Sequence, residues 1–274
     1  PARRDAWFQE GLILEGFGEF DEALSAFETS LTLEAQQPEA WFHIARCRAG
    51  QGRPREAALA CDQALMLDTR HAGALTLKGI SEEELGEREH ALQSLAKSLG
   101  IDPDQPVAWH RKGSVLLSLG RSAEAVDALD RSLDLAPGEP EVLYRKGLAC
   151  LGMGATDEAI EPLSASLDLD PKTPDAWYRK GAALAALGRH KEAIRALDRS
   201  LSLDPAIPAG WLEKGLSLQA TGDLPGAMAA FRAAIDADPT LAQPWYRPGI
   251  AGRLSNRMGE ALTTVSLGLP VDSR

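Results

Sequence analysis

The sequence predicts an all-α protein built from stacked pairs of helices, and three observations lead to this fold class. A phrase resembling "WYRKG" returns at a fixed spacing of 34 residues. One position of every copy is always Ala. Each copy also holds two stretches with the helical spacing of apolar residues, separated by a turn residue that is usually Gly. A fixed period of this length without insertions is typical of stacked modules and not of a closed globule.

The copies define eight repeats that follow a leader of residues 1–3. The repeats span residues 4–37, 38–71, 72–105, 106–139, 140–173, 174–207, 208–241 and 242–274. Repeat position 4 holds all six tryptophans of the chain, Trp7, Trp41, Trp109, Trp177, Trp211 and Trp245, and it holds Leu75 and Leu143 in the other two repeats. Position 20 is Ala eight times, as in Ala125, Ala159 and Ala193. We expect these Trp and Ala residues to be structural, because one helix pair cannot bury its apolar faces without neighbours.

Each repeat divides into two predicted helices. The first covers positions 1–14, is often opened by Pro, has apolar residues at positions 4, 8 and 11, and ends before a Gly at position 15. The second covers positions 18–30 and stops at an "LDP"-like stretch. Small residues at positions 8 and 20 allow the two backbones to approach, and the residue at position 4 is expected to fill the space beside them. The eighth repeat has Pro248 and Pro270 inside its predicted helices, so we expect it to be the weakest.

With Trp at position 4, Gly at 8, Ala at 20 and Pro at 32, the chain resembles the tetratricopeptide repeat family across residues 4–274. The sequence of its repeats most resembles that of bacterial and archaeal arrays. The resemblance implies an α-solenoid, a right-handed superhelix of antiparallel helix pairs with about 16 helices in total. It also implies a concave groove lined by the first helices, in which such a module binds a peptide or a partner protein.

The helix face that corresponds to this groove carries aromatic residues at position 5 and Arg at position 6 in several repeats. The predicted partner-binding residues are His110, Arg111, Tyr144, Arg145, Leu148, Tyr178, Arg179, Tyr246 and Arg247. Tyr and Arg are frequent anchors of protein interfaces, and the arginines favour a partner with acidic residues. The alternative interpretation is that position 5 packs against the neighbouring repeat and position 6 is a solvated edge.

Position 7 is Lys in five consecutive repeats, from Lys78 to Lys214. We expect its aliphatic stem to cover the seam between repeats. Its amine would then reach an acidic residue of the connecting loop, such as Asp102, Asp170 or Asp204.

Composition argues against several classes of partner. The formal net charge is -11 and the isoelectric point is about 5.0, so phosphate backbones and anionic lipid surfaces are repelled. We therefore expect no nucleic-acid binding, and no apolar run is long enough for membrane insertion. Three cysteines without paired spacing favour a reducing compartment, for which the cytoplasm is the expected location. The chain starts at Pro1 and not at Met, so we expect it to be a piece cut from a longer protein.

Nothing in the sequence points to an enzyme. The five histidines share no metal-ligand spacing, and neither a Gly-rich phosphate loop nor a GxSxG motif occurs. We therefore expect no catalytic residue, no metal and no cofactor.

Besides the binding module, two hypotheses stay open. One is a structural scaffold that self-associates into an oligomer or filament through its end repeats or its groove. The other is an interaction domain removed from a larger enzyme or sensor.

Overall fold

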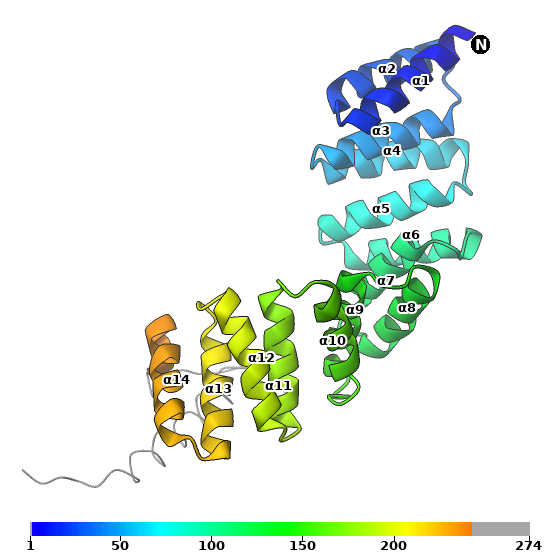
Figure 1. Ribbon diagram of the computed structural model, residues 1–274. Coiled ribbons are helices and arrows are strands. Elements are labelled where there is room, and N and C mark those ends of the chain that lie inside the picture. The colour runs from blue at the N-terminus through cyan, green and yellow to red at the C-terminus, as the bar shows by residue number, and fades with distance from the viewer. Residues whose placement is uncertain (1, 243–274) are drawn as a thin grey trace, which may run out of the picture. The chain divides into compact units, whose positions relative to one another are not determined.

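A computed structural model describes residues 2–242 of the chain (Figure 1). This part of the chain is helical and contains no strand. The helices are α1 (Ala2–Phe17), α2 (Phe20–Leu33), α3 (Pro38–Gly50), α4 (Pro54–Leu67), α5 (Ala72–Glu84), α6 (Arg88–Ile101), α7 (Pro106–Ser118), α8 (Ser122–Leu135), α9 (Pro140–Gly152), α10 (Ile160–Leu169), α11 (Pro174–Ala186), α12 (His190–Leu203), α13 (Pro208–Thr221), α14 (Leu224–Ala237) and the short 3₁₀-helix η1 (Pro239–Ala242).

These helices confirm the all-α prediction, and they form the pairs predicted for the first seven repeats. Fourteen α-helices lie in residues 2–242, against the prediction of about 16 for the whole chain. The predicted last pair, with Trp245, Tyr246 and Arg247, lies outside the described residues. The chain divides into two units, Pro1–Pro137 with α1 to α8 and Gly138–Arg274 with α9 to α14.

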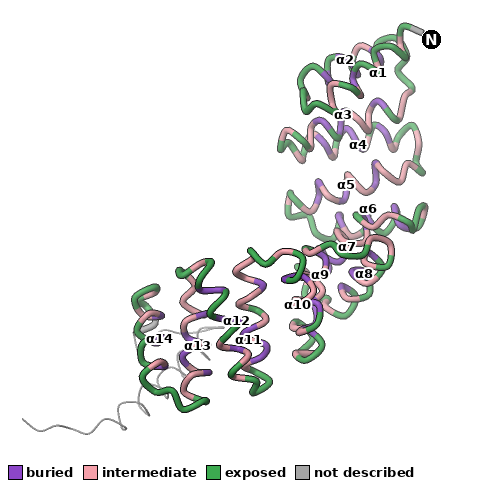
Figure 2. Tube along the Cα trace, viewed as in Figure 1, coloured by how far each residue is buried: buried purple, intermediate pink, exposed green. Residues whose placement is uncertain are grey.

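Inside each unit the repeats stack in chain order (Figure 1). In the first unit α1 packs on α2, α3 on α4, α5 on α6 and α7 on α8. The second helices α2, α4 and α6 also contact the first helix of the following repeat. The second unit repeats this pattern from α9 to α14. The first helices of successive repeats also touch, as α9 touches α11 and α11 touches α13. Buried residues lie along the helices, whereas the turns are largely exposed (Figure 2).

The helix ends follow from the repeated Pro and Gly. Pro stands in the first turn of α3, α7, α9, α11 and α13, where its missing N–H leaves no helical bond unmade. The Gly at position 15 has a φ between 70° and 87° in all seven described repeats, for example 74° at Gly188. A residue with a side chain is strained in this left-handed conformation, so Gly ends the first helix at this point.

A second close fit joins the two helices of each repeat. A Cβ added to Gly181 would lie 2.7 Å from Cγ of Leu197, at position 24, so Leu197 fills the space over the glycine. Trp177, at position 4, packs beside them against the cluster that contains Ala193 and Leu197. The same contact at position 8 exists between Gly79 and Leu95. In repeat 2 position 8 is Ala45 and position 24 is the smaller Cys61, both fully buried. A larger residue at position 8 is therefore matched by a smaller residue at position 24, as close packing requires.

A buried serine at position 27 ties each of five repeats to its own start. The hydroxyl of Ser200 donates to the carbonyl oxygen of Pro174 at 2.8 Å, and Ser166 makes the same bond to Pro140 at 2.7 Å. The corresponding bonds in the first unit come from Ser30, Ser98 and Ser132. Each bond spans 26 residues and joins the second helix to the first residue of the repeat.

The position-4 Trp seals the seam to the preceding repeat. The indole N–H of Trp211 donates to the carbonyl oxygen of Pro205 at 2.9 Å, and Nζ of Lys214 lies 5.0 Å from the centre of the Trp211 ring. Nζ of Lys214 also bonds Asp198 on the preceding second helix at 2.7 Å. The expectation that these lysines reach loop residues such as Asp204 is therefore wrong at Lys214, which bonds a carboxylate of helix α12 instead.

One second helix is shorter than predicted. Positions 18–30 of repeat 5 correspond to residues 157–169, but α10 begins only at Ile160. Pro162 is the reason, since proline lacks an N–H and its ring clashes with the carbonyl four residues earlier. The helix therefore starts where Pro162 falls in its first turn.

Candidate functional site

A polar network connects two first helices of the second unit. The hydroxyl of Tyr144, on α9, donates to a carboxylate oxygen of Asp175, on α11. The same oxygen accepts a bond from Nε of Arg179 at 3.3 Å. Burial, and after it the bond to Asp175, raises the pKa of Tyr144 above its ordinary value, so the phenol stays a protonated donor. Two predicted residues, Tyr144 and Arg179, are thus joined through Asp175 across repeats 5 and 6.

The remaining predicted residues of this unit lie beside the network. Arg145 pairs with Glu141 one helical turn earlier on α9, with 2.7 Å between Nη2 and Oε1. The guanidinium of Arg179 stands over the ring of Tyr178, 5.5 Å from its centre. Burial raises the pKa of Tyr178, and the charge of Glu213 acts in the same direction. Leu148 is half-buried on α9. The arginines therefore already face carboxylates of their own unit, which the prediction from sequence did not include.

In the same unit, a hollow of about 410 Å³ opens between α11, the start of α12 and α13. It is lined by Ala185, His190, Glu213, Leu216, Ser217, Gln219 and Ala220. Within residues 2–242, Oγ of Ser217 and Nδ1 of His190 are buried without a hydrogen-bond partner. Buried polar atoms normally have partners, so these two mark a place where a ligand could supply the missing bonds. Sequence reasoning missed this hollow, although the small residues at positions 12 and 13 signalled it.

His110 and Arg111 belong to the first unit and lie on α7. Nη1 of Arg111 lies 3.6 Å from a carboxylate oxygen of Glu83 on α5. His110 is half-buried. The predicted residues thus fall into two sets, one on each unit, and Tyr246 and Arg247 lie outside the described residues.

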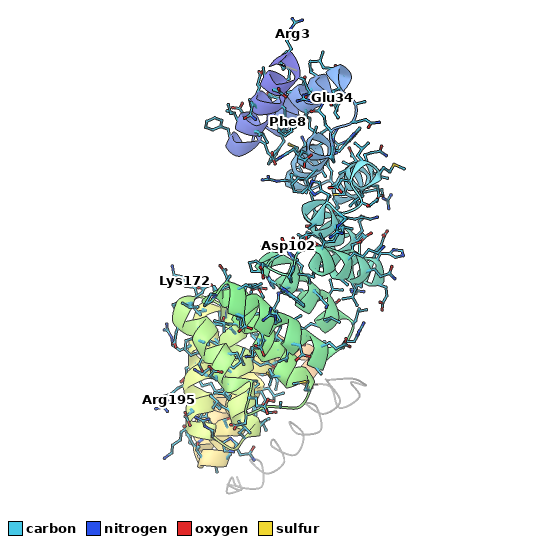
Figure 3. All side chains as sticks on the ribbon, turned by 90° about the vertical axis from the view of Figure 1, so that its right-hand side faces the viewer. Arg3, Phe8, Glu34, Asp102, Lys172 and Arg195 are labelled. Carbon is cyan, nitrogen blue, oxygen red and sulfur yellow. The ribbon has the colours of Figure 1, made fainter. Side chains whose placement is uncertain are left out.

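A second polar cluster, not singled out from the sequence, lies at the start of the chain. The side chain of Glu15, only 8% exposed, accepts Nδ1 of His43 at 2.7 Å and Nε of Arg46 at 3.0 Å. The rings of Phe8 (labelled in Figure 3) and His43 are 5.6 Å apart. Here position 5 packs against the following repeat. The signal in the sequence was Glu at position 12 followed by His and Arg at positions 6 and 9 of the next repeat.

A family model for the tetratricopeptide repeat matches the chain in overlapping segments, residues 8–74, 76–140, 110–174, 144–208 and 178–242. Together these segments cover most of the sequence. The chain belongs to the tetratricopeptide repeat (TPR) family. No curated protein is significantly similar to the sequence.

Solved structures share the TPR fold at low sequence identity. YrrB, described as a TPR protein with an unusual peptide-binding site, is 22% identical with a TM-score of 0.62, over 68% of this chain and 95% of that one. A TPR protein from Parabacteroides merdae is 15% identical with a TM-score of 0.61, over 94% and 100% of the two chains. The structure of the Cut9–Hcn1 hetero-tetramer of the APC/C is 17% identical in sequence with a TM-score of 0.61, over 93% of this chain and 49% of that one. These neighbours share the fold, and membership of the TPR family supports a protein-interaction module in general terms.

The TPR chain shows little reactive chemistry in its described part. Burial raises the pKa of the Cys47 thiol and of the Cys61 thiol to about 12, so both stay protonated at neutral pH and are poor nucleophiles. Residues 2–242 contain no group of three or more His, Cys, Asp or Glu side chains that could hold a metal ion. No helix in this range has the length and apolarity needed to cross a membrane.

Proposed function

We propose that this TPR chain is a protein-interaction module that binds an extended peptide segment across the first helices α9, α11 and α13 of the second unit. The observation that carries the proposal is the hollow of about 410 Å³ with the unpartnered polar atoms of Ser217 and His190. Glu213 lines this hollow and also acts on Tyr178, so the hollow and the Tyr–Arg network are parts of one surface.

The chemistry of this surface indicates what such a peptide contains. A small apolar side chain fits among Ala185, Leu216 and Ala220, and main-chain or hydroxyl groups of the peptide meet Ser217 and His190. The Arg179 and Asp175 side chains are 45% and 47% exposed, and such surface pairs contribute at most about 1 kcal/mol. A carboxylate of the peptide can therefore replace Asp175 as the partner of Arg179 at low cost, which is the basis for proposing an acidic partner.

The test is to select peptides from a displayed library against the whole chain and to measure their Kd by fluorescence anisotropy. Tyr178→Ala removes an aromatic anchor and should weaken binding roughly thirtyfold, since truncation of such an anchor costs about 2 kcal/mol. Ala220→Trp should block the hollow without unfolding the protein, because Ala220 is exposed. Arg195→Glu is the control of surface charge, since Arg195 points outward from α12 (Figure 3) and should leave the Kd unchanged. Unchanged affinity in both face variants would contradict the proposal.

A second candidate function, self-association, is favoured by the exposed apolar side chains of α1. Trp7, Ile13 and Phe17 are 38%, 60% and 79% exposed. If this helix joins copies of the chain, light scattering after size exclusion should give a mass that rises above 29.3 kDa with concentration. Phe17→Lys should then restore the monomer mass, whereas Leu203→Lys, at a side chain 39% exposed on α12, should not. A constant 29.3 kDa at all concentrations would exclude this function.

A further inference from the structure

A larger hollow, of about 710 Å³, lies in the first unit between α4, α5 and α6. It is lined by Asp62, Leu65, Met66, Thr69, Leu75, Lys78, Ser94, Lys97, Gly100 and Ile101. None of these lining residues carries an aromatic ring. Leu75 is the important member, because it stands at repeat position 4, where the three following repeats with a described tryptophan place an indole.

The surroundings of those indoles are the same each time. The N–H of Trp109, Trp177 and Trp211 donates to the carbonyl oxygen of the residue six positions earlier, over 2.8, 3.0 and 2.9 Å. The lysine three positions later lies over the ring, 4.9, 5.4 and 5.0 Å from its centre. For Leu75, the residue six positions earlier is Thr69 and the residue three positions later is Lys78. Both line the hollow.

The cation of this site is already in place. Nζ of Lys78 bonds Asp62 at 2.6 Å, just as Nζ of Lys214 bonds Asp198 at 2.7 Å above the Trp211 ring. Lys78 and Asp62 thus keep the ion pair that stands beside an indole in repeat 7, although position 4 of this repeat is a leucine. A cation that lines a hollow attracts the face of an aromatic ring.

The walls and the opening also suit an aromatic guest. Leu65, Leu75 and Ile101 are apolar, and the exposed Met66 offers a sulfur, which makes favourable contacts with ring edges. Gly100 has no Cβ, and one added there would meet no atom within 4 Å, so the rim is open at this point. The volume lies in the range of sites that hold drug-sized ligands, which leaves room beyond a single indole ring for the residues that flank it.

We propose that this hollow is a second binding site, which takes a tryptophan side chain of a partner protein segment in the place that Trp109, Trp177 and Trp211 occupy in their own repeats. The indole packs on Leu75 beneath the Lys78 ammonium, and its N–H donates to the carbonyl oxygen of Thr69. The site is separate from the peptide-binding face of the second unit and does not depend on it.

The test uses saturation-transfer NMR on the full chain with N-acetyl-tryptophanamide as the probe, and with N-acetyl-leucinamide and free indole for comparison. N-acetyl-tryptophanamide should bind, and N-acetyl-leucinamide should not. Leu75→Trp rebuilds the arrangement of the other repeats, so it should abolish binding. Lys78→Met should weaken binding roughly threefold through the lost cation–ring attraction. Leu59→Trp adds a tryptophan to an exposed position of α4 outside the hollow and is the matched control, expected to bind as the wild type does.

Two results would overturn the assignment. Binding of N-acetyl-tryptophanamide that persists in Leu75→Trp would place the probe elsewhere, and binding of free indole alone would exclude a peptide-borne tryptophan. Gly100→Phe closes the rim from a position with free space around its new Cβ, and it repeats the test should Leu75→Trp fail to fold. Loss of binding in this variant is expected, and retained binding contradicts the proposal.

Discussion

Replacement of Trp177 by Ala should lower the free energy of unfolding by about 3 kcal/mol, at the lower end of the range for large aromatic truncations because the ring is half-buried. The ring packs against the cluster of Leu184, Ala193 and Leu197, and its N–H satisfies the carbonyl of Pro171 at 3.0 Å. Urea unfolding followed by circular dichroism measures the loss.

Trp7→Ala is the matched control for this prediction. Trp7 stands at the same repeat position, but it is 38% exposed, and α1 is the first helix of its unit. Its replacement should cost less than about 1 kcal/mol, as surface substitutions usually do. Equal losses of unfolding free energy at the two tryptophans would mean that Trp177 does not stabilise the chain through its contacts between repeats.

Gly181→Ala should destabilise the chain by about 2 kcal/mol, although alanine is the better helix former. The new Cβ would lie 2.7 Å from Cγ of Leu197 and 3.3 Å from the carbonyl oxygen of Ala193, and such overpacking typically costs 1–3 kcal/mol, that is, about 2 kcal/mol. Gly100→Ala is the control, because its Cβ meets open space in helix α6 and the change should stabilise by about 0.5 kcal/mol.

A second substitution should recover part of the stability lost in Gly181→Ala. Repeat 2 combines Ala45 with Cys61 where repeat 6 combines Gly181 with Leu197. Adding Leu197→Cys to Gly181→Ala should therefore cost less than the sum of the two single changes by about 1 kcal/mol or more, measured as a double-mutant cycle in urea. If the changes in unfolding free energy of the two single variants simply add, the side chains at the two positions do not compete for the same space.

Much of the fold could be predicted because a repeat presents the same evidence many times. Periodic Trp, Gly and Ala predicted the helix pairs, and in the structure Gly188 has a left-handed φ and Ala193 is completely buried. The late start of α10 at Ile160 was missed, because Pro162 occurs at its position in one repeat only and leaves the period intact. A feature that occurs in one repeat only is therefore not visible in the repeat pattern.

The candidate site was harder to predict, because its contacts join side chains of different repeats. The aromatic and Arg positions were visible, but the bond from Tyr144 to Asp175 and the pairing of Glu15 with His43 and Arg46 depend on how neighbouring helices are offset. Likewise, Lys214 reaches Asp198 on the preceding second helix and not a loop residue, and Lys78 reaches Asp62 in the same way. Spacing along one helix does not contain that information.

The serine bond that closes five of the seven described repeats has a consequence for how such a gene changes. Ser166 reaches back to Pro140 and Ser200 to Pro174, so the internal contacts of each module begin and end inside one stretch of 34 codons. Unequal recombination between neighbouring copies adds or removes whole modules without cutting this bond. The length of the array is therefore free to vary during evolution, whereas the length of the module is not.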